Sequence, residues 1–209
     1  ARPTHAYLGL SAGLDFETKI FVKPDAAELL ETALRKPGYH TQVIAMGTNT
    51  DPYQQLEKKR KITRSILEVL ARFNHPVSIV TKSHLVKRDL DILGPMAAKR
   101  LAKVAVSITT LDHRLARAME PRASTPSKRL ETISQLKASG VPAGVMFAPA
   151  IPGLNDHEME AVLDAAHNAG AEEAGYIVLR LPLEVKDLFQ EWLAEYAPNR
   201  ASRIISLIQ

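Results

Sequence analysis

The polar residues that could do chemistry in this sequence follow short apolar runs. The first cluster is Gly47-Thr48-Asn49-Thr50-Asp51, and the second is Thr81-Lys82-Ser83-His84. The third begins at Ser107, whereas the fourth, residues 148–156, is apolar before it turns polar. Hydroxyls and amides can hold ribose and amino groups, an ammonium can bind a carboxylate, and an apolar wall can pack against a flat ring. Together these side chains suit a zwitterionic ligand that carries a ribose and a purine.

Charged residues near these clusters add candidates, each with a purely structural alternative. Lys82 can meet a carboxylate, and Arg122, in a polar loop before a capped helix, can approach the same region. An arginine in such a loop can equally saturate helix-end carbonyls, and strand-end Ser or Thr often satisfies loop backbone. His84 and His113 lie near the predicted site, but the seven histidines show no HExxH or comparable metal spacing.

Short runs rich in Val and Ile must position these side chains. They are too short for helices and almost unbroken in apolarity, which is typical of parallel strands covered on both faces. The predicted strands span residues 42–46, 77–80, 103–108, 143–147 and 174–179.

The segments between these runs carry helix signals. Apolar residues at helical spacing predict a helix over 62–73, and Thr125-Pro126 predicts an N-cap followed by a proline at the first helical position. Asn155 with Glu158 resembles a capping box. Gly94-Pro95 is expected to split residues 89–103 into a short turn and a helix beginning near Pro95.

Strands that alternate with helices predict a parallel α/β sheet, either an open doubly wound sheet or a TIM-like barrel. No glycine-rich dinucleotide fingerprint follows a predicted strand, which favours the barrel, complete or partial. In both folds ligands bind at the carboxyl ends of the strands, where the polar clusters fall.

Composition sets further bounds. The 209 residues fit one domain, and no apolar run approaches the roughly 20 residues of a membrane helix. No secretory signal is visible, so a cytoplasmic location is expected. The chain has no cysteine, which excludes disulfides and thiolate-ligated metals within these residues.

The net charge is +4 and the pI is about 9.3, partly because of the run Lys58-Lys59-Arg60-Lys61. Such a run indicates either a patch for nucleic acid or another anionic substrate, or the solvated face of a helix.

Several of these stretches resemble, as a set and in order, the radical S-adenosylmethionine (SAM) proteins related to spore photoproduct lyase, in an uncharacterised bacterial branch. The stretches are Asp15-Phe16-Glu17-Thr18-Lys19, Gly47-Thr48-Asn49-Thr50-Asp51-Pro52-Tyr53, Thr81-Lys82-Ser83, Ser107-Ile108-Thr109-Thr110-Leu111-Asp112, Glu120-Pro121-Arg122-Ala123 and Pro152-Gly153-Leu154-Asn155-Asp156.

The resemblance implies a single core domain over residues 1–209, built as a partial (β/α)6 TIM-like barrel. In that family a CxxxCxxC loop binds a [4Fe-4S] cluster, SAM chelates it, and reduction by an external electron donor yields a 5′-deoxyadenosyl radical that abstracts hydrogen from a substrate. This chain has no such loop, so we expect the first strand and the loop to be missing and the C-terminus to be truncated too. The intact protein is expected to be a lyase-like enzyme, and the chain alone to be inactive.

The resemblance also implies roles for individual residues in SAM binding. Thr48 and Asn49 match the region that holds the amino group of SAM. Lys82 and Ser107 match polar contacts near its carboxylate and ribose, and the wall from Ala148 to Ile151 matches the adenine side.

The resemblance further implies that Arg122 is a candidate partner for the carboxylate of SAM, and that Tyr7 and Tyr53 are candidates for the substrate mouth. Two alternatives stay open. The chain could be a Schiff-base lyase that uses Lys82 as its nucleophile, or a cluster-free basic module that binds nucleic acid or a protein partner. The substrate is not identified by the sequence, and nucleic acid is one candidate.

Overall fold

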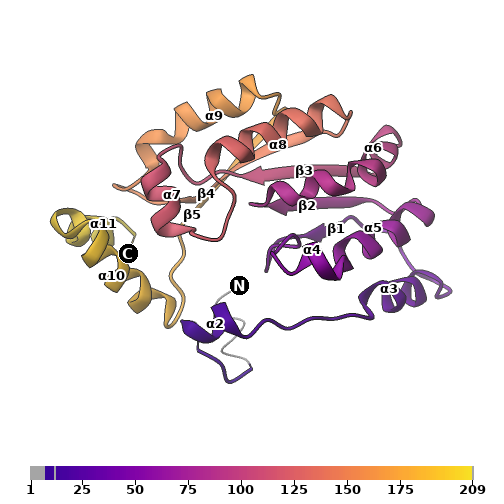
Figure 1. Ribbon diagram of the computed structural model, residues 1–209, viewed down its shortest axis with the longest axis horizontal. Helices are drawn as coiled ribbons and strands as arrows, with labels where there is room; N and C mark the ends of the chain where they lie inside the picture. Colours follow the sequence, from indigo (N-terminus) through magenta and orange to yellow (C-terminus); the bar gives the residue numbers. More distant parts are fainter. Residues whose placement is uncertain (1–7, 12, 209) are drawn as a thin grey trace.

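The computed structural model describes residues 8–11 and 13–208. Its strands form one parallel sheet in the order β1-β2-β3-β4-β5 (Figure 1). Their bounds are β1 Ile44–Met46, β2 Val77–Thr81, β3 Ala102–Ser107, β4 Ala143–Ala150 and β5 Glu173–Val178. All five predicted strands are confirmed, with small shifts at their ends.

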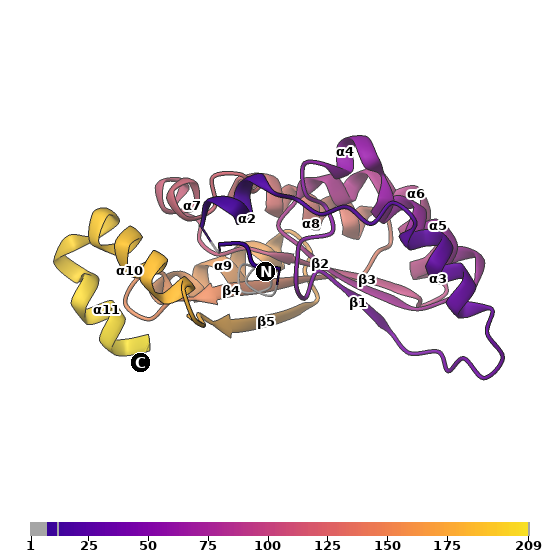
Figure 2. The same ribbon diagram turned by 90° about the horizontal axis from the view of Figure 1, so that it is seen from below.

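Helices connect the strands and cover one side of the sheet. The α-helices are α2 Leu14–Thr18, α3 Ala26–Leu34, α4 Glu57–Arg60, α5 Ile62–Arg72, α6 Leu90–Ala98, α7 His113–Met119, α8 Pro126–Ala138, α9 Met159–Asn168, α10 Val185–Tyr196 and α11 Ala201–Ile208. The 3₁₀ turns are η1 His84–Asp89, η2 Asp156–Glu158 and η3 Pro198–Arg200. Helices α5, α6 and α8 lie on the same side of the sheet (Figure 2), and α10 and α11 lie beyond one end of it.

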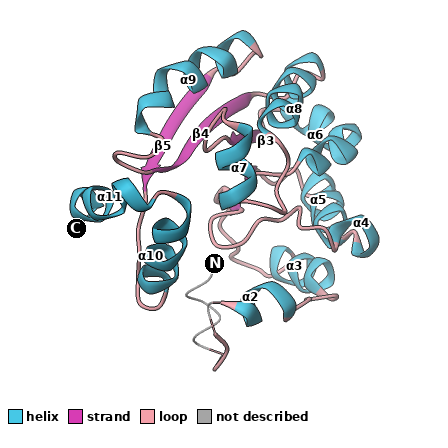
Figure 3. Ribbon diagram, turned by 60° about the vertical axis from the view of Figure 1, so that its left-hand side comes forward, coloured by secondary structure: helices cyan, strands magenta, loops and turns pink. Residues whose placement is uncertain are grey.

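This arrangement confirms a parallel α/β fold of the partial TIM-like barrel type. Each strand pairs with the next one along the chain, as in a barrel, whereas a doubly wound sheet reverses its strand order. The helices α9, α8, α6 and α5 follow one another around the outside of the strands (Figure 3).

The core lies between the sheet and this helical layer. Ile79, Val106 and Phe147 point into it and are fully buried. The opposite face is more open, since Lys103 is exposed and Gly144 is half-buried. The prediction that both faces of the strands are covered is therefore wrong for the described residues. The apolar runs arise because small residues, rather than charged ones, occupy much of the open face.

Helix α6 corrects the prediction made from Gly94-Pro95. The helix begins at Leu90 and continues through Pro95 to Ala98. A proline removes one backbone hydrogen bond inside a helix. Burial of Leu93 and Met96, on the same helix, stabilises the segment enough to outweigh that loss.

The two predicted N-caps have opposite outcomes. Thr125 is the N-cap of α8, and its hydroxyl accepts the amide of Lys128 at 3.5 Å, which confirms that prediction. The prediction of a capping box at Asn155 and Glu158 is wrong, because no side-chain cap forms at η2. Both side chains bind elsewhere, at the ends of neighbouring strands.

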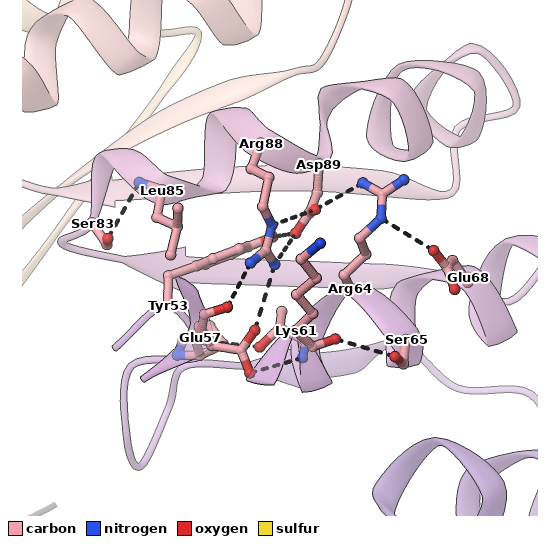
Figure 4. A network of polar contacts seen from close by, with 12 residues as sticks. Tyr53, Glu57, Lys61, Arg64, Ser65, Glu68, Ser83, Leu85, Arg88 and Asp89 are labelled. Atoms are coloured by element: carbon pink, nitrogen blue, oxygen red, sulfur yellow. Dashed lines mark hydrogen bonds and ion pairs between the residues drawn. The ribbon is translucent and has the colours of Figure 1, made fainter. Parts of the chain in front are cut away.

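A buried ionic network joins α5 and η1 (Figure 4). The Asp89 carboxylate, which is fully buried, accepts hydrogen bonds from Arg64 at 3.0 Å and from Arg88 at 2.8 Å. The Tyr53 hydroxyl donates to the same carboxylate at 3.1 Å. Arg88 also donates to the carbonyl oxygen of Glu57 at 2.7 Å, so η1 is held against α4.

Among the residues described, no helix is both long and apolar enough to span a bilayer.

Candidate functional site

Strand register brings three of the predicted ligand residues together. Thr81 of β2 pairs with Val106 of β3. The residues that follow these two, Lys82 and Ser107, are therefore neighbours at the carboxyl ends of the strands. The Ser107 hydroxyl donates to the carbonyl oxygen of Ala148 in β4 at 3.1 Å. The Lys82 ammonium, the Ser107 hydroxyl and the Ala148 carbonyl thus lie at the carboxyl ends of three neighbouring strands, and we call this group the polar edge.

Glu120 holds the Lys82 side chain at this edge. Lys82 Nζ donates to Glu120 Oε1, and Thr109 Oγ1 lies 3.0 Å from the same oxygen. The Arg129 guanidinium donates to Glu120 Oε2 at 2.6 Å. The Glu120 side chain is only 12% exposed and that of Arg129 only 2%, whereas Lys82 is 32% exposed and faces the solvent side of the group.

Electrostatics keep this carboxylate ionised. Burial raises the pKa of Glu120, but the charges and hydrogen bonds of Lys82 and Arg129 outweigh burial and leave the pKa below its ordinary value of 4.5. The two cations, Lys82 and Arg129, are matched by two carboxylates, because Asp51 also lies at this edge and accepts the Lys82 amide at 2.7 Å.

Arg129 also fixes the loops behind this group. Its guanidinium donates to the carbonyl oxygens of Ser107 at 2.9 Å and of Ser124 at 2.8 Å. Sequence reasoning missed Arg129, because it lies within a polar helical stretch and its pairing depends on the path of the preceding loop. Glu120 was visible in the motif Glu120-Pro121-Arg122, but only Arg122 was considered as a ligand residue.

Asp51 links the first polar cluster to the second. Its carboxylate accepts the Thr81 hydroxyl and the Lys82 amide, both at 2.7 Å. Gly47 allows the two segments to approach, because its φ is +96° and a Cβ there would lie 1.9 Å from the Val80 carbonyl oxygen. The segment from Gly47 to Asp51 therefore packs against β2. The composition of the segment alone did not predict this contact.

Asn155 and Glu158 join the loops after β3 and β4. The buried Asn155 amide donates to the Thr109 carbonyl at 2.7 Å, while its oxygen accepts the Ile151 amide at 2.7 Å. Glu158 accepts the hydroxyl of Thr110 at 2.6 Å. These contacts make the β4 loop a rigid wall beside Ser107.

Other predicted SAM-binding residues lie around the edge. Thr48 and Asn49 are exposed in the bend that follows β1, on the strand next to Lys82. Arg122 is exposed in the loop between α7 and α8. The structure places all three on loops at the carboxyl-end side of the sheet.

The remaining predicted residues are placed differently. Ile151 is fully buried in a cluster with Leu154, beneath α11. Tyr53 is 2% exposed, so a role at the substrate mouth would require its ring to leave the core. Tyr7 lies outside the described residues.

The donors for a metal site are also absent from the described part of the chain. No group of three or more His, Cys, Asp or Glu side chains there could hold a metal ion. The full sequence contains no cysteine.

The family follows from comparison with known proteins. The family model of the Radical SAM superfamily matches residues 15–166, so the chain belongs to that superfamily. This match confirms the resemblance to radical SAM proteins found in the sequence, and it covers β1 to β4 and their connecting helices.

The relatives are longer than this chain. Uncharacterized proteins of Mycobacterium tuberculosis and Mycobacterium bovis are 37% identical over 205 residues, which are 97% of this chain and 60% of each relative. An uncharacterized protein of Methanocaldococcus jannaschii is 31% identical over 115 residues, 55% of this chain and 43% of that protein. A solved structure of a spore photoproduct lyase mutant is 12% identical with a TM-score of 0.45, covering 86% of this chain and 66% of that one. The chain therefore spans about 60% of the length of its mycobacterial relatives.

Proposed function

We propose that the polar edge at Lys82, Ser107 and Ala148 binds SAM, and that the intact protein is a radical SAM enzyme. The observation that carries this proposal is the juxtaposition of Lys82 and Ser107 at the carboxyl ends of β2 and β3. Active sites of parallel α/β barrels lie at this end of the strands.

The residues present fit the methionine and ribose ends of SAM. Lys82 Nζ gives one of its three N–H donors to Glu120, which leaves donors for a ligand carboxylate. The Ser107 hydroxyl donates to Ala148 and keeps its lone pairs for a ribose hydroxyl. Thr48 and Asn49, on the neighbouring loop, would serve the amino group.

The residues present do not fit a [4Fe-4S] cluster. Such clusters are held by cysteine thiolates, and the chain has none. The cluster and the electron donor would have to come from outside these residues. The chemistry that bound SAM supplies in this superfamily is hydrogen abstraction, and the role of this chain's residues is to bind and orient the cofactor.

Orientation is the task of the buried residues. Glu120 and Arg129 hold Lys82 in one place before the ligand arrives, so the ligand does not have to order that long side chain. The Asn155 contacts keep the β4 wall in position for the adenine ring. The substrate of the reaction is a separate question that this site does not answer.

The Schiff-base alternative is disfavoured by the same geometry. A nucleophilic lysine must be a neutral amine. Lys82 Nζ is instead engaged by the Glu120 carboxylate and would have to leave it before attacking a carbonyl carbon.

The first test is equilibrium binding of SAM to the chain, measured by calorimetry. Lys82→Ala removes a charged hydrogen bond to the carboxylate and should weaken SAM affinity about tenfold or more. Lys103→Ala is the matched control, because it removes an exposed lysine at the start of β3 and should leave affinity unchanged. Equal losses in both variants would contradict the proposed site.

The activity test uses the intact gene product, reconstituted anaerobically with iron and sulfide. Formation of 5′-deoxyadenosine from SAM under reduction, lost in Lys82→Ala, would support the enzyme. SAM binding without 5′-deoxyadenosine formation would leave the binding site in place and refute the activity.

A further inference from the structure

The basic run at α4 has no part in the SAM site. Lys58, Lys59, Arg60 and Lys61 are all exposed. None of their side chains forms an ion pair with a residue that the structure describes. The run comes after the loop that follows β1, so it lies on the carboxyl-end side of the sheet, as Lys82 does.

Two further elements continue this basic surface. Turn η1 starts directly after β2 and is held against α4 by the bond from Arg88 to the Glu57 carbonyl (Figure 4). On its other side the His84 amide donates to Ser124 Oγ at 2.9 Å, which holds η1 against the loop that leads into α8. Lys128 is exposed in the first turn of α8. Two chain segments that are distant in sequence, α4 and the start of α8, therefore present lysines on either side of η1.

The lysines around His84 disfavour its charged form. Partial burial lowers the pKa of His84, and the charges of Lys128, Lys87 and Lys58 lower it further. The acidic group that faces them, Glu131, is already paired with Lys87 at 2.9 Å. Lys58 and Lys128 have no such partner among the described residues. The surface therefore keeps an excess of positive charge at the rim of the proposed SAM site.

We propose that this basic surface, formed by Lys58, Lys59 and Lys128 around η1, binds the phosphodiester backbone of a nucleic acid. The surface borders the strand ends through Lys82-Ser83-His84, so a bound strand would run past the SAM site. The inference that nucleic acid is the substrate rests on the proposed function, whereas the binding itself does not.

The chemistry of the surface favours this partner. Lysines on separate elements offer several point charges in a row, and a polyanion with a regular charge repeat can engage them together and release its counterions. His84 Nδ1 and the Ser124 hydroxyl are bonded to each other at 2.9 Å, so in this pair the other ring nitrogen of His84 is the group left to meet a phosphate oxygen. Its cations are mostly lysines, which meet phosphates as point charges and do not read bases as arginine forks do, so binding should show little sequence preference.

The experiment measures fluorescence anisotropy of a labelled single-stranded oligonucleotide and of a labelled duplex, titrated with the chain without SAM at several salt concentrations. The double variant Lys58→Gln with Lys128→Gln should lose about tenfold in affinity, and its salt slope should fall by about one unit per lysine. The matched control is Lys36→Gln with Lys99→Gln, two exposed lysines at the amino ends of the strands, which should leave affinity within about twofold.

Three outcomes would overturn the proposal: no binding by the wild-type chain, equal losses in both double variants, or competition by polyglutamate as strong as by unlabelled oligonucleotide. Calorimetry with SAM on the same proteins separates this proposal from the previous one. Oligonucleotide binding without SAM binding would refute the SAM site alone, and SAM binding without oligonucleotide binding would refute the basic surface alone.

Discussion

Glu120 receives Lys82 on one carboxylate oxygen and Arg129 on the other, in a place where water is almost excluded. Arg129 would be a buried, unpaired cation without this carboxylate, and such charges are costly. Glu120 is thus needed for the fold as well as for placing the Lys82 ammonium.

The loss of folding stability at acid pH should depend on the protonation of Glu120. Because its folded-state pKa is lowered, its ionisation stabilises the fold above its ordinary pKa of 4.5, and this contribution is lost as pH falls through the folded-state value. Glu120→Gln should lower stability at neutral pH by about 3 kcal/mol and flatten the dependence on pH below 4.5. Urea denaturation across this pH range measures both effects.

Glu131→Gln is the control for that experiment. Glu131 forms an exposed ion pair with Lys87, so its loss should leave the neutral-pH stability almost unchanged. Equal effects of the two substitutions would show that the Glu120 pairs contribute no more than a surface contact.

At the scale of elements, Gly47 determines how the first polar loop leaves β1. It lies beside Val80 of β2, at a backbone angle that side chains rarely adopt. The following loop then reaches Asp51, whose carboxylate caps the end of β2.

Gly47→Ala should therefore separate β1 from β2. The new Cβ would overlap the Val80 carbonyl oxygen, and φ of +96° would strain the backbone, so we expect a loss of about 3 kcal/mol or more. Thermal melting checks the stability, with Gly38→Ala as the comparison, because a Cβ at Gly38 meets nothing within 4 Å although its φ is also positive. A loss in Gly47→Ala no larger than in Gly38→Ala would mean that the contact with Val80 does not matter.

Sequence patterns predicted the elements well where apolar composition decides them, as in the five strands and α5. They failed at Pro95 and Asn155, where tertiary contacts outweigh local preference. Lys82, Ser107 and Ala148 could be predicted as neighbours because parallel strands end at one edge. Glu120 and Arg129 could not, since their meeting depends on the course of two loops.

At the scale of the molecule, the last strand is poorly covered. Tyr176, Ile177 and Val178 of β5 are 65%, 50% and 46% exposed, and within residues 8–11 and 13–208 β5 pairs with β4 alone. Unpaired, apolar strand edges favour association between chains.

The 209-residue chain alone should accordingly be marginally stable or self-associating. Sedimentation velocity over a range of concentrations should show association, and Ile177→Lys should reduce it by placing a charge on the exposed strand. A monomeric chain with a sharp melt at high temperature would contradict this expectation.

The contacts of the proposed SAM site also imply an order of assembly during synthesis. The bond from Lys82 to Asp51 spans 31 residues, that from Lys82 to Glu120 spans 38, and that from Asn155 to Thr109 spans 46. Each contact joins one βα unit to the next, so none needs residues far downstream. As the chain leaves the ribosome, the Asp51 link can close first, the Glu120 link second and the Asn155 link last. Once the chain has emerged from the ribosome beyond Arg129, Lys82 can thus already be held in place, while the loop after β4 is still unformed.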